Sequence, residues 1–430
     1  DLGAALQRLD AAIEANPDEA RLYQMRGRVR MGITTGGKLV FAEEAEARLV
    51  HHGDRIRMGN IVVEILHTPG HTPEHISFMI TDGAAGDAPM GVLTGDFVFV
   101  GDVGRPDLLE KAAGVAGTME ESARTLYRSL ERFRAFPGWL QILPGHGAGS
   151  ACGKALGAVP TSTLGYELLV NWAFQCKDEE EFVRLVLEDQ PEPPRYFATM
   201  KRLNRDGPPI LGRLPSPRRM QPRELEPLLD EGGVVVDLRG RDLFAAGHVP
   251  GTLNIPFNTS FPNWAGWFLS YGDPVYFIAD GQAQADAAAR QLALIGIDNA
   301  AGFFDGETLE RWAEGHVGLQ SYALTDWEGA RRAVEEEGAV LIDVRNRSEW
   351  NQGHVAYARH IHLGYLRDHL EEIPADRPVY LYCLSGGRSA IGASLLQAEG
   401  FRNVRNVEGL FADAAGAGLP VEREETEILA

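Results

Sequence analysis

Cysteine is scarce in this sequence: only Cys152, Cys176 and Cys383 occur among 430 residues. So few cysteines, odd in number, argue against a disulfide framework and fit a reducing cytoplasm. Long apolar runs are also missing, since none reaches the ~20 residues that a membrane-spanning helix needs. No secretory signal peptide is found. These absences predict a cytoplasmic protein that does not insert into a membrane.

Positive charge is the second shortage. Lys and Arg number 41 against 61 Asp and Glu, so the net charge is -20, and no basic run offsets it. Such a surface repels nucleic acid and anionic membranes, which excludes both as expected partners. The length exceeds what one core usually organises, so two or three domains are expected.

The second half of the sequence repeats itself. "VVVDLRGRDLFAAGHVPGTLNIP" (234–256) aligns without a gap with "VLIDVRNRSEWNQGHVAYARHIH" (340–362). Strand and helix patterns alternate in both copies, which predicts a small doubly wound α/β domain twice over, at residues 222–318 and 325–420. The Pro- and Arg-rich residues 205–221 before them are typical of a linker.

A cysteine stands between a predicted strand and a predicted helix in the second copy. Cys383 follows the strand 380–382 and precedes the helix 389–399. The loop continues through Leu384, Ser385, Gly386, Gly387 and Arg388. A helix N-terminus stabilises a thiolate, and glycines allow the backbone N–H groups to form a cradle. The pattern predicts a nucleophilic Cys383, with Arg388 facing an anionic group; the plain alternative is a buried core cysteine.

Only four residues separate Cys383 from Arg388, one fewer than in cysteine phosphatases. The loop resembles that of the rhodanese sulfurtransferases, in which the cysteine carries a persulfide. Two further pairs share the resemblance, and we expect them to brace the fold: Asp343 with Arg345, and Gly353 with His354. In the first copy Ala279 and Gln284 replace Cys383 and Arg388. That copy therefore resembles an inactive rhodanese domain.

The first half carries metal-type residues at three strand ends. "NIVVEILHTPGH" ends at His71, "GVLTGD" at Asp96 and "WLQILPGH" at His146. Each is an apolar, β-rich run that stops at His or Asp beside glycine, which predicts one site on a sheet edge.

Together with "GDVGRPDLL" (101–109), these runs resemble the metallo-β-lactamase fold, and most of all its persulfide dioxygenase branch. The resemblance implies an αββα sandwich over residues 1–204 and one Fe(II), bound by His71 and Asp96. It places His146 near the metal, less often as a ligand, and Arg105 near the substrate.

One signature of that fold is missing. The His-x-His-x-Asp-His motif should lie well before residue 49, yet no histidine precedes His51. Residues 5–32 resemble a single helical tetratricopeptide motif instead. Either the chain lacks the first part of its metal domain, which its start at Asp1 favours, or the metal site is altered.

The order of the three parts, over about residues 38–420, resembles that of the bacterial persulfide dioxygenase–rhodanese fusion proteins. The resemblance implies oxidation of a thiol persulfide, such as glutathione persulfide, to sulfite. It also implies that Cys383 exchanges sulfur with thiosulfate, sulfite and thiols, in the service of sulfide detoxification. Two alternatives stay open: a zinc hydrolase of the glyoxalase II type with an accessory rhodanese, and a sulfurtransferase with a non-catalytic front domain. A homo-oligomer is also left open.

Overall fold

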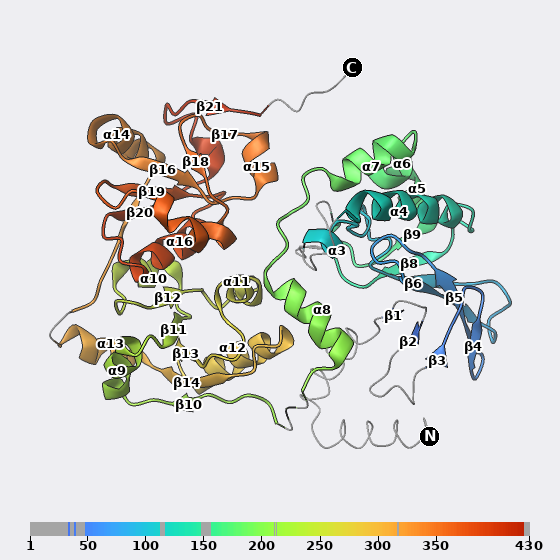
Figure 1. Ribbon diagram of the computed structural model, residues 1–430, viewed down its shortest axis with the longest axis horizontal. Coiled ribbons are helices and arrows are strands. Elements are labelled where there is room, and N and C mark those ends of the chain that lie inside the picture. The colour runs from blue at the N-terminus through green and yellow to red at the C-terminus, as the bar shows by residue number, and fades with distance from the viewer. Residues whose placement is uncertain are drawn as a thin grey trace. The chain divides into compact units, whose positions relative to one another are not determined.

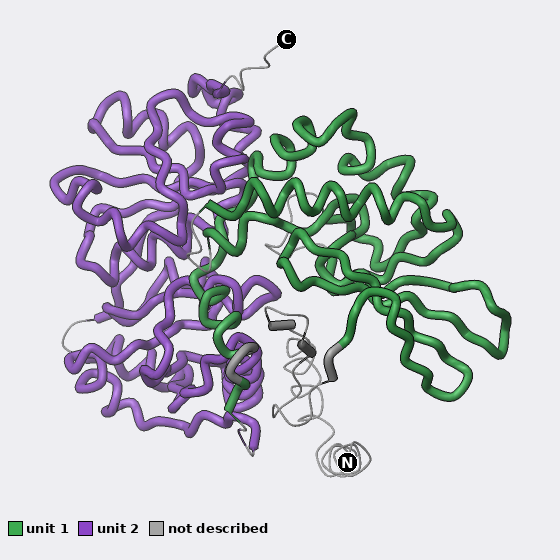
Figure 2. The backbone as a smooth tube through the Cα atoms, turned by 45° about the vertical axis from the view of Figure 1, so that its right-hand side comes forward, with its two compact units in different colours: residues 1–209 green, residues 210–430 purple. Residues whose placement is uncertain are grey.

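The computed structural model describes most of the chain, namely residues 33–34, 38–39, 48–111, 117–147, 156–209, 211, 213–315 and 318–424. The chain divides into two compact units, residues 1–209 and residues 210–430 (Figure 2). The helical pair expected over residues 5–32 lies outside the described residues, as does Cys152. Among the described helices, none combines the length and the apolar character needed to cross a bilayer.

A six-stranded sheet is the centre of the first unit (Figure 1). Its strands lie in chain order: β4 (Arg55–Met58), β5 (Ile61–His67), β6 (Ile76–Asp82), β7 (Gly91–Gly95), β8 (Gln141–Pro144) and β9 (Ser162–Thr163). Neighbours run antiparallel, except that β7 and β8 are parallel. Strands β5, β7 and β8 therefore all end at the same edge of the sheet, which brings together the residues that follow them.

Helices accompany this sheet in the described part of the unit, and those between residues 119 and 187 contribute buried side chains to its core. They are α3 (Leu108–Lys111), α4 (Met119–Phe133), α5 (Leu164–Val170), α6 (Trp172–Gln175), α7 (Glu179–Leu187) and α8 (Tyr196–Asp206). The longest, α4, buries Leu126, Leu130 and Phe133, which lie on one face at helical spacing. A separate antiparallel sheet is formed by β1 (Ile33–Thr34), β2 (Lys38–Leu39) and β3 (Arg48–Leu49).

The second unit contains two five-stranded parallel sheets. The first has the order β10 (Arg218–Arg219), β14 (Ala300–Phe304), β13 (Val275–Ile278), β11 (Val234–Asp237) and β12 (Leu253–Asn254). The second has the order β15 (Ala323–Thr325), β20 (Val404–Val407), β19 (Val379–Tyr382), β16 (Val340–Asp343) and β18 (Arg359–His360). Both sheets follow the same chain order, so the repeat seen in the sequence is also a repeat of topology.

The remaining elements connect and cover these strands. In the first repeat they are η2 (Pro222–Glu224), α9 (Leu225–Asp230), α10 (Arg241–Ala246), α11 (Phe261–Phe268), α12 (Gln282–Leu294) and α13 (Gly306–Ala313). In the second they are α14 (Trp327–Glu337), α15 (Arg347–Gln352), η3 (Leu363–Glu372), α16 (Gly387–Ala398), η4 (Phe411–Asp413) and the antiparallel pair β17 (His354–Val355) and β21 (Val421–Glu422).

Helix α16 is buried almost all round, which is unusual for a helix beside a sheet. One face packs on its own sheet. Other contacts reach the first repeat: the Ser394 hydroxyl accepts a hydrogen bond from the backbone N–H of Asn254, at 3.0 Å, and α16 also packs against α10. The helix that follows Cys383 is therefore held by both repeats.

A short strand lies within the predicted linker. The sequence predicts a linker over residues 205–221, but Arg218–Arg219 forms the edge strand β10, paired with β14. The local Pro- and Arg-rich composition disfavours a strand here, but pairing with β14, whose residues come later in the sequence, stabilises one. The rest of the division into domains stays a prediction.

Candidate functional site

Cys383 lies where the sequence places it, between a strand and a helix. Strand β19 ends at Tyr382, and α16 begins at Gly387, two residues before the expected start. The Cys383 side chain is only 2% exposed. Leu384 and Ser385, by contrast, are exposed, so the loop reaches the surface directly beside the thiol.

The loop surrounds the sulfur with donors. The Gly386 backbone N–H donates to the Cys383 Sγ at 3.2 Å, and the Ser389 hydroxyl donates to it at 3.4 Å. Gly386 has φ +85°, a conformation that side chains disfavour, so glycine is required for this turn. Burial raises the pKa of the Cys383 thiol, but the Arg388 charge and the hydrogen bonds from Ser389 lower it by more. The net pKa lies below its usual value, which favours the nucleophilic thiolate.

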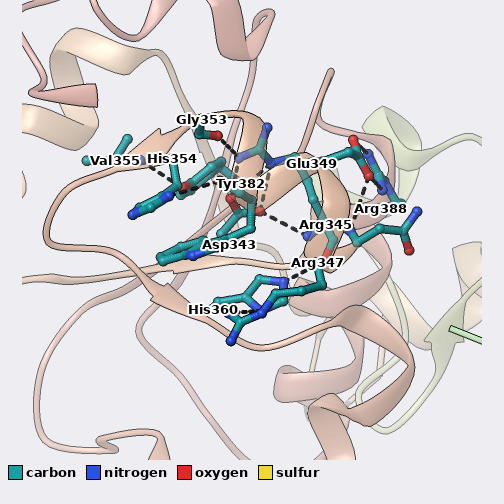
Figure 3. Close-up of polar contacts among 12 residues, drawn as sticks. Asp343, Arg345, Arg347, Glu349, Gly353, His354, Val355, His360, Tyr382 and Arg388 are labelled. Carbon is teal, nitrogen blue, oxygen red and sulfur yellow. Dashed lines mark hydrogen bonds and ion pairs between the residues drawn. The ribbon is translucent and has the colours of Figure 1, made fainter. Parts of the chain in front are cut away.

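Arg388 has a partner that the sequence did not reveal. Its guanidinium donates to both carboxylate oxygens of Glu349, at 2.6 and 2.7 Å (Figure 3). Glu349 also accepts the Asn346 backbone N–H at the start of α15, and Asn-x-x-Glu is a visible capping signal. The cap was readable from the sequence, but the pairing with Arg388 across 39 residues was not.

A second network braces the same repeat, as the sequence predicts. The Arg345 guanidinium pairs with Asp343, at 2.6 Å, and donates to the Gly353 carbonyl, at 2.7 Å (Figure 3). The His354 ring stacks on Trp350, with 3.6 Å between centroids. All are buried and satisfied by one another, so they hold the loops around the site and leave its chemistry to other residues.

The first repeat keeps the bracing and lacks the nucleophile. Arg239 pairs with Asp237 at 2.7 Å and donates to the Gly247 carbonyl, as in the second repeat. Ala279, at the position of Cys383, is buried and carries no reactive group. Gln284, at the position of Arg388, accepts the Asp280 backbone N–H at 2.9 Å.

In the first unit, the three strand-end residues converge as the sequence predicts. His71 Nε2 lies 3.5 Å from one carboxylate oxygen of Asp96, and His146 Nε2 lies 3.3 Å from the other. Burial raises the pKa of Asp96, but the two histidines lower it by more, so the carboxylate is ionised. Their role as metal ligands stays a prediction.

Hydrogen bonds to neighbouring groups determine the tautomers of the His71 and His75 rings. His71 Nδ1 lies 2.9 Å from the Arg105 carbonyl, which can only accept, so His71 Nε2 is left to face Asp96. His75 Nε2 accepts the Asp96 backbone N–H at 3.2 Å. Burial, together with the neighbouring His71, lowers the pKa of His75 to about 4, so this ring is neutral at pH 7. His75 thus accepts a hydrogen bond from the Asp96 backbone and helps to hold that residue in place.

The cluster fits a metal ion only in part. Imidazole and carboxylate are suitable donors for Fe(II) or Zn²⁺, and the ring orientation of His71 is the one a ligand needs. However, across the described ranges no group of three or more His, Cys, Asp or Glu side chains is arranged to hold a metal. A complete ligand set is therefore not found there, and His71 and Asp96 would need a further ligand to hold a metal ion.

Arg105 does not lie as a substrate-binding residue would. Its side chain is fully buried, donates twice to Asp107 at 3.0 and 2.7 Å, and donates to the Pro191 carbonyl at 2.6 Å. These contacts give Arg105 a structural role: its side chain fixes the loop, and its backbone carbonyl orients the His71 ring. The predicted contact with substrate has no support from this geometry.

Comparison with known proteins agrees with both halves of this description. The family model "Rhodanese-like domain" matches residues 221–313 and 326–414. A sulfurtransferase of Allochromatium vinosum is 32% identical over 96 residues, which are 22% of this chain and 90% of that protein. The uncharacterized protein YqhL of Bacillus subtilis is 41% identical over 78 residues, 18% of this chain and 62% of YqhL.

The chain is also similar to a metallo-β-lactamase from Staphylococcus aureus whose crystal structure is known. The two sequences are 44% identical over the aligned part, which covers 60% of this chain and 71% of the other, and the TM-score is 0.55. The chain is a fusion of a metallo-β-lactamase-like domain with two rhodanese-like domains. The expected α/β fold class of the fusion is confirmed. Its rhodanese relatives place it among enzymes of sulfur metabolism.

Proposed function

We propose that the fusion transfers sulfane sulfur from thiosulfate to a thiol through Cys383. The observation that carries this proposal is the buried Cys383 Sγ, which accepts hydrogen bonds from Gly386 and Ser389 below a buried helix. A sulfurtransferase relative and the rhodanese family match support the same reaction class.

The transfer has two balanced steps. The Cys383 thiolate attacks the outer sulfur of thiosulfate, forming a new S–S bond, while the sulfur–sulfur bond of thiosulfate breaks and sulfite leaves with its electron pair. An acceptor thiolate then attacks the outer sulfur of the Cys383 persulfide. This step gives the acceptor persulfide and restores the thiolate. The Gly386 N–H and the Arg388 charge stabilise the anions in both steps.

A Cys383→Ser variant of the full chain tests the proposal. Thiosulfate-to-thiol transfer should fall by at least about a thousandfold, since a serine hydroxyl is almost never ionised at neutral pH and forms no persulfide. Cys176 is the matched control, because burial raises the pKa of its thiol to about 11 and leaves it unreactive. A Cys383→Ser enzyme that keeps most of its activity would refute the proposal, as would equal loss in Cys176→Ser.

A second activity is proposed for the first unit, on the convergence of His71 and His146 upon Asp96. It is the oxidation of a thiol persulfide by O2 to sulfite and free thiol, with one water molecule supplying the third oxygen of sulfite and two protons released, as in the persulfide dioxygenases that the sequence resembles. A bound metal would supply the activation of O2, with His71 and Asp96 as its ligands. The sulfite produced would drive the first transfer step in reverse, because it can accept the outer sulfur of the Cys383 persulfide to give thiosulfate and the free thiolate.

Metal analysis of the purified fusion decides between the candidates for this unit. Stoichiometric iron with O2 uptake on glutathione persulfide supports the dioxygenase, whereas zinc with thioester hydrolysis supports the glyoxalase II alternative. Metal content near zero supports a non-catalytic front domain. The thiol used, the cytoplasmic location and any homo-oligomer stay predictions.

A further inference from the structure

One side chain of the inactive repeat reaches the Cys383 loop. Arg241 is the first residue of α10, and its Nη1 donates to the Ser385 carbonyl at 2.8 Å. In the repeat alignment Arg241 falls on Arg347, which instead lies near His360 and Glu424 in its own repeat. The same position therefore serves two different purposes, and only the inactive copy sends its arginine to the loop.

The peptide group that Arg241 contacts is the one that contacts the sulfur. The Ser385 carbonyl and the Gly386 N–H belong to a single peptide plane. The carbonyl accepts from Arg241, and the N–H donates to Cys383 Sγ at 3.2 Å. A cation on the carbonyl fixes the orientation of this plane and polarises it, so that its N–H becomes a stronger donor.

Among the described residues, Arg241 forms no ion pair with a carboxylate as short as its hydrogen bond to the loop. Asp242 lies 3.5 Å from its Nε and Glu408 lies 3.8 Å from its Nη2, both longer than the contact with Ser385. Arg388 differs, because its two terminal nitrogens each donate to the Glu349 carboxylate, at 2.6 and 2.7 Å. Arg241 is thus the guanidinium at this loop whose shortest contact is the loop backbone.

We propose that Arg241 is a positioning residue for sulfur transfer, and that the inactive repeat is retained because it completes the Cys383 loop. The proposal rests on the function proposed above. Arg241 acts through the Ser385–Gly386 peptide to hold the thiolate in its ionised form. The first repeat thereby contributes to a reaction whose nucleophile it lacks.

Several charged groups lie around the loop, and the test has to separate Arg241 from them. Arg388 on α16 acts on the thiol itself, Glu349 on α15 and Asp343 at the end of β16 act on Arg388, and Glu408 after β20 lies 3.8 Å from Arg241. None of these changes in an Arg241 variant. A shift in Cys383 ionisation therefore reports on the Arg241 contact.

The experiment measures the rate of Cys383 alkylation by iodoacetamide against pH in the full chain, with the modified peptide quantified by mass spectrometry. Arg241→Ala should move the midpoint upward by about half a pH unit to one unit, because a donor to the thiolate is weakened. Arg241→Lys, which keeps the charge, should recover part of that shift. Arg311→Ala is the matched control, since Arg311 is an exposed arginine of the same repeat that pairs only with Glu307 within α13 among the contacts found.

Transfer activity is measured on the same variants. We expect kcat/KM to fall about three- to tenfold in Arg241→Ala, mostly through kcat, with Arg311→Ala unchanged. An alkylation midpoint in Arg241→Ala equal to that of Arg311→Ala overturns the proposal, even if the enzyme transfers sulfur. A shifted midpoint in a chain that shows no sulfur transfer supports the positioning role and refutes the proposed function instead.

Discussion

At the scale of single residues, the Cys383 site is defined by the hydrogen-bond donors to the sulfur and by the carboxylate that pairs with Arg388. The loop supplies its own donors to the thiol, while Glu349 fixes the guanidinium from a helix 39 residues earlier. Loop residues were predictable because they are consecutive in the sequence and each has a chemical reason to be there. Glu349 and Arg241 were not, since contacts over 39 and 144 residues depend on how the repeats pack.

The buried ring of His362 predicts how the stability of the fold depends on pH. Burial, with the neighbouring His360 and Arg388, lowers its pKa to about 4 from the usual 6.5. Between these values the unfolded chain binds a proton that the folded chain does not. Stability should therefore fall as the pH drops from about 6.5 to about 4, by up to about 3 kcal/mol for this group.

The measurement is urea unfolding of the full chain at about pH 7 and about pH 4.5, followed through the second unit. His362→Asn cannot titrate and can still hydrogen-bond, so its loss of stability over this range should be smaller by about 2 kcal/mol. Equal losses in the wild type and the variant would show that His362 is not a buried neutral ring.

At the scale of elements, the predicted strand before Cys383 and the predicted helix after it are found with shifts of one or two residues. Their signals were local: an apolar run, a glycine-rich turn and a helical period. The burial of α16 on several sides was not predictable from the same residues, because two of the elements it packs against, β12 and α10, lie in the other repeat. Strand β10 inside the predicted linker was not predictable for a related reason, since it pairs with β14, which comes much later in the chain.

Gly386 links the turn to the site. Its φ is +85°, and a Cβ at this position would lie 2.9 Å from Arg241 Nη1. Gly386→Ala should cost about 1–2 kcal/mol of stability and reduce sulfur transfer at least about tenfold, because the peptide that donates to the sulfur must rotate.

Gly338 is the matched control for this change. It also has a left-handed φ, +66°, at the end of α14, but nothing lies within 4 Å of its added Cβ. Gly338→Ala should cost about 1 kcal/mol and leave transfer intact. Equal activity in the two variants would show that the Gly386 turn matters for folding alone.

At the scale of the whole molecule, the chain carries two candidate sites in two separate units. The first unit resembles its relatives in fold, yet its described residues supply an incomplete metal site. The sequence indicated this shortage through the absent histidine motif. It could not indicate that Arg105 is structural, because the pairing with Asp107 and Pro191 appears only once the loop is folded.

The separation of the units predicts that their activities are independent. Asp96→Ala removes the carboxylate between His71 and His146, so any bound metal should be lost. Thiosulfate-to-thiol transfer by Cys383 should stay within about twofold of the wild type, since its residues all belong to the second unit. A tenfold loss of transfer in Asp96→Ala, at unchanged stability, would show that the two sites are coupled.

The central claim is that Cys383 alone carries the transferred sulfur. The most direct test is the mass of the intact chain after treatment with thiosulfate and removal of the excess, followed by peptide mapping. The account predicts one added sulfur atom per chain, located on Cys383, removed by a thiol acceptor and absent in Cys383→Ser. Sulfur on Cys176 or Cys152, or an equal adduct in Cys383→Ser, would contradict it.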